Sequence, residues 1–393
     1  MAGSRTRNGI WCWARGRDHD VIGGGKGWTR AFLVGFRVMT RAPRLVIRVD
    51  ADHLIGLGHG VRCAALAEAL GESAVVTVVG AGAVLPGLFP GRGTVPVVAA
   101  DDDDGFARIL AGLGPAAVVI DHPRRNGPWS RLVRRAVPGA VVAVIDDEGG
   151  DLDADLVVNG TVLEAYHRYS GLPARAQVLA GPRHTLLRPV FGRSRWPAAG
   201  AGPGVGREAG VLMVVGSGAG AADWARFLAS EVLDRTGWGR SRLVVGAAFP
   251  DRAALVSAGD AAGIQVLVGQ SGAELAALLA SAPVALITGG MIVYEALAVG
   301  VPAVVYPQIP NLLPEARWLA GRGCIHDLGA GGGFDAAAVR GAVNTLLGDR
   351  AAAAGMSRRQ RRLIDGGGAG RMAAALLALV AGAPPVPDRG PAA

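Results

Sequence analysis

Cysteine and lysine are scarce in this 393-residue chain. Its cysteines, Cys12, Cys63 and Cys324, stand far apart, with no pair at zinc-site spacing and no even set for a disulfide framework. This usage fits a reducing compartment, and we expect a cytoplasmic protein. Lys26 is the only lysine and does not stand in a Gly-x-x-x-x-Gly-Lys-Ser/Thr motif, which excludes a P-loop.

Other patterns are missing as well. No uninterrupted apolar run reaches the roughly 18 residues that a membrane helix needs. Neither a Gly-x-Ser-x-Gly elbow nor a His-Glu-x-x-His zinc motif occurs. We therefore expect no transmembrane segment, no elbow of the serine-hydrolase type and no helical zinc site.

Positive charge is concentrated at the amino terminus. Residues 1–38 hold seven basic and two acidic residues, which gives +5 of the formal net charge of +8. Because the remainder is only mildly basic, we expect no nucleic-acid partner. Residues 1–43 lack periodicity and are interpreted as a disordered or non-native extension, with Met39 as a candidate start of translation and a disordered basic tail as the alternative.

The length predicts two domains. After residue 43, short apolar segments rich in β-branched residues alternate with helical periodicity, which predicts parallel, doubly wound α/β sheets. We expect a first Rossmann-like domain over residues 44–195, a linker rich in Pro, Gly and Ala over 196–207, a second Rossmann-like domain over 208–382 and a disordered tail over 383–393.

Five strands are expected in each domain. The predicted strands of the first domain are residues 45–49, 74–79, 116–120, 141–145 and 156–158. Those of the second are residues 211–215, 243–245, 264–268, 284–287 and 303–306. Helical periodicity is clearest at residues 60–70, 106–113, 128–136, 222–233, 273–279, 292–298 and 370–380.

The loop after the first strand carries the leading catalytic candidate. Its candidate ligand-binding and catalytic residues are Asp52, Gly56, Gly58, His59 and Arg62. The start of the following helix attracts anions and disfavours a charged imidazole, which predicts a neutral His59 able to accept a proton. Arg62 can face a phosphate or pair with Asp50 or Asp52. The alternative is a tight turn in which His59 only caps the helix.

A second glycine-rich turn follows the strand at residues 284–287. Gly289 and Gly290 precede a helix that begins near Met291, a pattern that suits a phosphate cradle of backbone N–H groups. Glu295 can accept both hydroxyls of a ribose, which predicts nucleotide recognition. The alternative is a solvated acid that favours the helix N-terminus.

Further candidates follow other strands. Gly216 and Ser217 form a similar turn, although small residues also arise from close packing. Asp121 can orient water or a sugar hydroxyl, with a turn-forming role as an equal alternative, and we interpret Asp147 as a turn former. The arginines within residues 358–362 are interpreted as a solvated helix face.

Several stretches together resemble a known family. Residues 48–63, 145–147, 155–159, 181–191 and 289–302 are similar, in order, to motifs of the UDP-sugar hydrolase of pseudaminic acid biosynthesis and its spore-coat polysaccharide relatives. The second half is also similar to that of the lipid-linked peptidoglycan glucosaminyl transferase. The matches span most of residues 44–330.

This resemblance implies a glycosyltransferase-B fold, with two Rossmann-like domains facing a cleft, and a nucleotide-diphosphate sugar as substrate without metal or other cofactor. It implies that His59 is the catalytic base and that Gly289, Gly290 and Glu295 hold the nucleotide. The chain departs from the family at His122, where the family has Tyr, and at Asn311-Leu312, where it has Asn-Gln. Asn311 remains a candidate substrate contact.

Three functions are consistent with these residues. The first is hydrolysis of a nucleotide sugar, with His59 activating water. The second is transfer of the sugar to a sugar, lipid or aglycone hydroxyl. The third is nucleotide-sugar binding without catalysis, which the departures from the family motivate.

Overall fold

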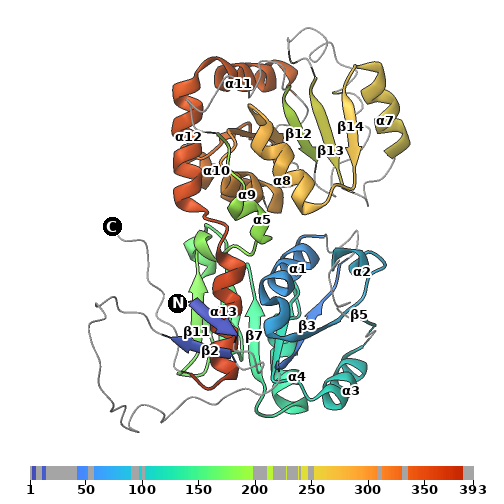
Figure 1. Cartoon of the computed structure of the whole chain (residues 1–393), viewed down its shortest axis with the longest axis vertical. Helices are drawn as coiled ribbons and strands as arrows, with labels where there is room; N and C mark the ends of the chain where they lie inside the picture. The colour runs from blue at the N-terminus through green and yellow to red at the C-terminus, as the bar shows by residue number, and fades with distance from the viewer. Residues whose placement is uncertain are drawn as a thin grey trace, which may run out of the picture.

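The computed structural model shows two α/β domains stacked along the long axis of the molecule (Figure 1). Each contains a parallel, doubly wound sheet, so the predicted fold class is confirmed. The structure describes residues 2–5, 11–14, 42–51, 57–89, 97–99, 102–197, 210–215, 227, 238, 240–246, 252–307, 312–329 and 335–383.

The first domain is built on a seven-stranded parallel sheet with the order β11-β9-β7-β6-β3-β4-β5. Its strands are β3 (Arg44–Val49), β4 (Val75–Val79), β5 (Val97–Val98), β6 (Ala117–Asp121), β7 (Val141–Ile145), β9 (Leu156–Asn159) and β11 (Gln177–Ala180). Chain order reverses between β3 and β6, the place where ligands gather in such sheets. Strand β6 ends on the site candidate Asp121, and the candidates Gly58, His59 and Arg62 follow β3 in the chain.

Helices cover both faces of this sheet. They are α1 (Gly58–Leu70), α2 (Leu85–Leu88), α3 (Asp103–Leu113) and α4 (Asn126–Ala136). Helix α3 begins where the Asp102 side chain accepts a hydrogen bond from the Gly105 N–H, and it ends at Gly114 in the left-handed region. Apolar residues of α1 fill the core on one face, and those of α3 and α4 fill the core on the other.

The second domain has a six-stranded parallel sheet with the order β14-β13-β12-β15-β16-β17. The strands are β12 (Leu212–Val215), β13 (Arg242–Val245), β14 (Gln265–Val268), β15 (Ala285–Ile287), β16 (Ala303–Val305) and β17 (His326–Asp327). Its helices are α7 (Arg252–Ala261), α8 (Gly272–Ser281), α9 (Met291–Val299), α10 (Leu313–Gly321), α11 (Ala336–Gly348) and α12 (Arg350–Leu363). Chain order reverses between β12 and β15, so this sheet has a topological switch point there, as the first sheet has between β3 and β6.

Two helices cross between the domains. Helix α5 (Pro189–Arg193), within the predicted first domain, packs against α8 and α9 of the second. Helix α13 (Gly368–Val380) lies within the predicted second domain but packs against α1 (Figure 1). Met372 and Leu376 join the core of the first sheet, which explains why α13 returns there. Helix α5 therefore packs with the second domain, although it precedes the boundary expected at residue 195. Helix α13 packs with the first domain, although it lies before the boundary expected at residue 382.

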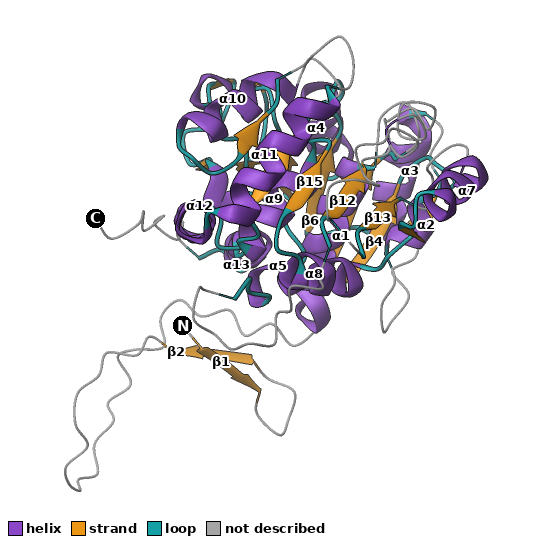
Figure 2. Ribbon diagram, turned by 90° about the horizontal axis from the view of Figure 1, so that it is seen from above, coloured by secondary structure: helices purple, strands orange, loops and turns teal. Residues whose placement is uncertain are grey.

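The remaining elements are short. Strands β8 (Gly150–Asp151) and β10 (Tyr169–Ser170) pair with each other, and single turns form η2 (Gly71–Ser73), η3 (Glu164–Tyr166) and η4 (Pro182–His184). Near the amino terminus, β1 (Ala2–Arg5) and β2 (Trp11–Ala14) form an antiparallel hairpin that joins neither sheet (Figure 2). The sequence predicted no ordered element there. The predicted helix at residues 222–233 lies, except for Phe227, outside the described residues, as do residues 198–207 and 384–393.

One segment of the described chain, Arg350–Val380, is long and apolar enough to span a membrane by length and composition. It consists of α12 and α13, which are separate helices with residues 364–367 between them. Residues of α13 lie in the core of the first domain, as expected for a buried helix of a globular fold.

Candidate active site at the domain junction

The first turn of α1 carries a histidine and an arginine on one face. His59 and Arg62 are three residues apart, a spacing that places side chains side by side on a helix. Both reach Asp121, the last residue of β6. The turn and the strand end thus meet at the topological switch point of the first sheet.

The His59 ring pairs with a fully buried carboxylate. Its Nδ1 lies 2.6 Å from Oδ1 of Asp121, and the exposed fractions of the two side chains are 15% and 0%. A carboxylate accepts hydrogen bonds, so a contact this short requires a proton on Nδ1. In the neutral ring, Nε2 is then the nitrogen with a free lone pair, which can accept a proton from a nucleophile.

Arg62 holds the carboxylate in place. It donates from Nε to Oδ2 of Asp121 at 2.6 Å and from Nη2 to Oδ1 at 2.7 Å. Burial alone raises the pKa of Asp121, but the charges of Arg62 and then His59 hold it well below its usual range. Asp121 therefore stays ionised beside the His59 ring.

These contacts revise several expectations. Arg62 pairs with Asp121 and Asp147 and not with Asp50: its Nη1 lies 2.6 Å from Oδ1 of Asp147. Asp147 is therefore an ion-pair partner rather than a turn former. Asp121, expected to orient water or a sugar hydroxyl, contacts the His59 ring instead. The sequence could not show these pairings because they join three separate strand and helix ends.

The turn-forming role belongs to the neighbouring Asp146, whose Oδ2 accepts hydrogen bonds from the N–H groups of Glu148 and Gly149. Asp50 pairs with Arg48 and accepts the N–H of Ala81 at 2.7 Å. Asp50 therefore joins the chain after β3 to the chain after β4, and it forms no ion pair with Arg62.

The second domain meets this dyad with the start of α9. Gly289 and Gly290 have φ angles of 105° and 81°, a region that favours glycine, and they deliver the chain into the helix at Met291. A Cβ atom on Gly58 would lie 3.6 Å from Cγ of Met291. The N-termini of α1 and α9 therefore face each other across the domain junction, and both offer free N–H groups to an anion.

Glu295 lies one turn into α9. It is buried, with 7% of its surface exposed, and it makes no hydrogen bond to any residue that the structure describes. Burial raises its pKa to about 8, against the opposing charge of Arg188. An unpaired buried carboxyl is costly and suits a ligand with hydroxyl donors. It is not the solvated acid of the alternative interpretation.

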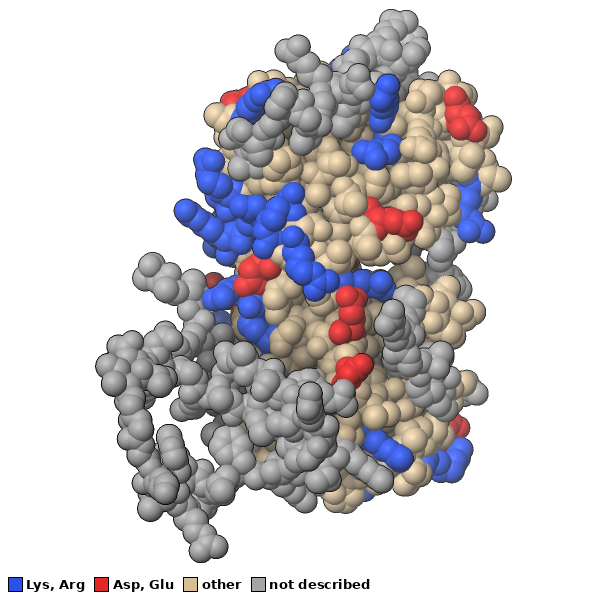
Figure 3. Space-filling model, in the orientation of Figure 1, with Lys and Arg blue, Asp and Glu red and all other residues tan. Residues whose placement is uncertain are grey.

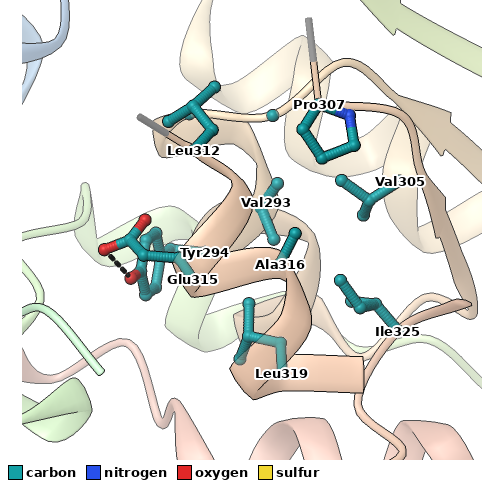
Figure 4. Close-up of a pocket in the computed structure, with 11 residues that line it drawn as sticks. Val293, Tyr294, Val305, Pro307, Leu312, Glu315, Ala316, Leu319 and Ile325 are labelled. Carbon is teal, nitrogen blue, oxygen red and sulfur yellow. Dashed lines mark hydrogen bonds between the residues drawn. The ribbon is translucent and has the colours of Figure 1, made fainter. Parts of the chain in front are cut away.

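A small recess opens beside these glycines. Gly289, Gly290 and Tyr294 line it together with Leu312 and Glu315, and apolar side chains form the opposite side (Figure 4). The hydroxyl of Tyr294 donates to Oε1 of Glu315 at 2.9 Å.

Glu315 also joins the domains. Its Oε1 accepts a hydrogen bond of 2.7 Å from the hydroxyl of Thr161, which follows β9 of the first domain. Burial raises the pKa of Glu315, and the charge of Asp147 adds to that rise. Sequence reasoning missed Thr161 and Glu315, which lack a local motif. Tyr294 was inside the glycine-rich motif but received no role.

The remaining candidates are not placed. Asp52, Gly56, Gly216, Ser217 and Asn311 lie outside the described residues. Among the residues that are described, no group of three or more His, Cys, Asp or Glu side chains could hold a metal ion.

Comparisons with known proteins give a fold. No family model matches the chain. No curated protein matches it significantly. Among solved structures, MurG of Acinetobacter baumannii superposes with a TM-score of 0.57 at 14% identity, covering 85% of this chain and 99% of that one. A UDP-GlcNAc 2-epimerase of Neisseria meningitidis, bound to UDP-GlcNAc, gives 0.55 at 10%, covering 85% and 99%.

The calicheamicin glycosyltransferase CalG4 gives a TM-score of 0.52 at 16% identity, covering 86% of this chain and 98% of that one. The similarity extends over both domains and over nearly the whole of each neighbour. At these identities it establishes the architecture rather than the reaction. The chain therefore has the glycosyltransferase-B fold.

Proposed function

We propose that this protein binds a nucleotide-diphosphate sugar at the domain junction and hydrolyses its glycosyl bond, with His59 as general base. One observation carries the proposal: the His59–Asp121 pair stands opposite the N-terminus of α9. A base held in one tautomer and an anion-binding helix end are the two elements that cleavage of a glycosyl diphosphate requires.

The second domain holds the nucleotide in this proposal. The N–H groups at the start of α9 bind the diphosphate, and Gly290 lets the chain approach it closely. The unpaired carboxyl of Glu295 accepts hydrogen bonds from the ribose hydroxyls. We propose UDP as the nucleotide because the similar epimerase structure is bound to UDP-GlcNAc.

The reaction is a substitution at the anomeric carbon. A water oxygen forms a bond to that carbon as the bond to the diphosphate oxygen breaks. The water proton passes to Nε2 of His59, and the ionised Asp121 stabilises the resulting imidazolium. The departing nucleoside diphosphate takes the bonding electrons, and the N-terminus of α9 stabilises its charge.

Water is the proposed nucleophile because His59 is only 15% exposed, which suits a small acceptor. The rival is transfer of the sugar to an acceptor hydroxyl, and the shared fold with the calicheamicin glycosyltransferase favours it. Both reactions use the same base and the same nucleotide site. We place the activity in glycan-precursor biosynthesis in the cytoplasm, which the scarcity of cysteine supports.

The test is a panel of UDP, GDP, TDP and CMP sugars incubated with the protein, with and without candidate acceptors, and read by mass spectrometry. The proposal predicts free sugar and nucleotide without an acceptor. Release that depends on an acceptor identifies a transferase. Calorimetric binding of a nucleotide sugar without any product identifies a binding protein and rules out both reactions.

A further inference from the structure

The second domain carries a group of arginines that the proposed reaction does not use. We name the arginine surface by its members, which are Arg195, Arg322, Arg358, Arg359, Arg361 and Arg362. Five are exposed, and Arg361 is partly so. Figure 3 shows basic side chains gathered over the edge of the second domain that α12 forms.

Folding assembles this surface from three segments. The Nε atom of Arg359 on α12 donates to the carbonyl of Gly323 at 2.8 Å, which brings α12 beside the end of α10. There the Arg322 guanidinium lies 3.4 Å from the ring centre of Trp318. The third segment follows α5.

Arg361 and Arg195 each lie near the end of α9. A Cβ on Gly300 would lie 2.7 Å from Cδ of Arg361. The neighbouring Val299 accepts a hydrogen bond from the Trp196 N–H, which brings Arg195 to the same place. The arginine surface is thus continuous across α10, α12 and the segment after α5.

No residue that the structure describes neutralises the charge of this surface by an ion pair. None of the six arginines forms an ion pair with a described residue, whereas nearby Arg183 and Arg371 share Asp365. Helix α12 contains five arginines and no acidic residue. Gathering like charges without counter-charges is unfavourable for folding, and it creates a strong positive potential for an anionic partner.

The arrangement of the arginine surface indicates which kind of anionic partner it binds. Four of the arginines lie on α12, Arg322 follows α10 and Arg195 follows α5, so the surface presents no helix N-terminus to a nucleic-acid groove. The Trp318 face is covered by Arg322 and is not free to stack on a base. An array of phosphate groups, such as the headgroups of a bilayer present, fits several exposed arginines gathered on one surface.

We propose that the arginine surface docks the protein onto a bilayer containing anionic phospholipids. This inference does not depend on the proposed reaction. The sequence did not predict it, because the charge of residues 44–393 is modest overall and only the fold concentrates part of it at one edge.

The experiment is co-sedimentation of the full chain with vesicles of phosphatidylcholine alone or mixed with phosphatidylglycerol. The wild type is expected to bind only the mixed vesicles and to dissociate as salt rises. The test variant is Arg322→Gln/Arg358→Gln/Arg362→Gln, which spares Arg359 and Arg361 because these contact neighbouring backbone.

A matched control removes the same charge from the first domain. Arg108→Gln/Arg135→Gln/Arg168→Gln changes three exposed arginines that also lack ion pairs with described residues. The test variant should lose affinity on the order of 100-fold, since each basic residue near an anionic surface contributes about fivefold. The control should bind like the wild type, and circular dichroism should show both variants folded.

Three outcomes overturn the proposal. They are equal binding to both kinds of vesicle, equal loss of affinity in the test and control variants, and retention of wild-type affinity by the test variant. The same proteins are titrated with duplex DNA. Binding of DNA through the arginine surface, without binding to anionic vesicles, assigns the surface to nucleic acid and excludes the bilayer.

Discussion

The Nδ1 atom of His59 lies 2.6 Å from Oδ1 of Asp121, although 62 residues separate them in the chain. The pair exists only because α1 starts, and β6 ends, at the switch point of the first sheet. Folding therefore supplies what a histidine near glycines lacks by itself, which is a fixed tautomer and a counter-charge.

Asp121→Asn should lower turnover, which depends on the orientation of His59, without changing the binding of the nucleotide. An amide no longer stabilises the imidazolium and no longer fixes the tautomer of His59. We expect turnover to fall on the order of 10²- to 10⁴-fold. The affinity for UDP should stay unchanged because Asp121 lies in the other domain from Glu295. Steady-state kinetics and calorimetry measure the two effects, and unaltered turnover would contradict the assignment of Asp121.

The low pKa of Asp121 predicts an acid-sensitive fold. Its folded-state pKa lies below its unfolded value, so the stabilisation is complete above the unfolded pKa of about 3.9 and is lost as pH falls towards the folded value. Asp121→Asn should therefore lower the free energy of unfolding at pH 7 by a few kcal/mol, and by a smaller amount at pH 3, where this loss has begun. Urea denaturation at both pH values tests this, and a constant difference would disagree.

Glu295 should release a proton when the nucleotide binds. At pH 7 its pKa of about 8 keeps it protonated, whereas ribose hydroxyls favour the carboxylate. Calorimetry of UDP in buffers of different ionisation enthalpy should give close to one proton released at pH 7 and none for Glu295→Gln. An identical proton count in the two proteins would show that Glu295 does not meet the ligand.

The same group makes a stability prediction. Between the unfolded pKa of about 4.3 and the folded pKa of about 8, the folded state binds a proton that the unfolded state lacks. The free energy of unfolding from this group therefore falls by about 1.4 kcal/mol per pH unit over that range. Glu295→Gln should remove this decline, and thermal denaturation across the range measures it.

The bond between Thr161 and Glu315 should restrain the two domains. Thr161→Val removes the donor and is expected to lower the free energy of unfolding by about 1–3 kcal/mol and to broaden the domain arrangement in small-angle scattering. Glu315→Gln should leave the scattering unchanged, since its amide oxygen still accepts both bonds. Thr345→Val, on the exposed side of α11, is the control. Equal effects of Thr161→Val and Thr345→Val would exclude the restraint.

Much of the fold could be predicted from local pattern. The nearly unbroken apolar strands β3, β6 and β7 indicated parallel pairing because both of their faces are buried. The destination of α13 could not be predicted in this way. An apolar helix face fits either sheet, and only the packing of Met372 and Leu376 against the first core decides.

The site was partly predictable for a related reason. His59, Gly290 and Glu295 stand in glycine-rich strand–helix turns, whose geometry is local. Asp147 was misread as a turn former because its partner Arg62 lies 85 residues away. Thr161 and Glu315 are 154 residues apart and belong to different domains, so no spacing rule joins them.

The central claim is that His59 is the base, and the most direct test compares nucleotide release by the wild type and His59→Gln with the donor sugar that the panel identifies. The account predicts a loss of turnover on the order of 10²- to 10⁴-fold, with the affinity for UDP unchanged by calorimetry. Turnover by His59→Gln within a few-fold of the wild type, at equal affinity, would contradict it.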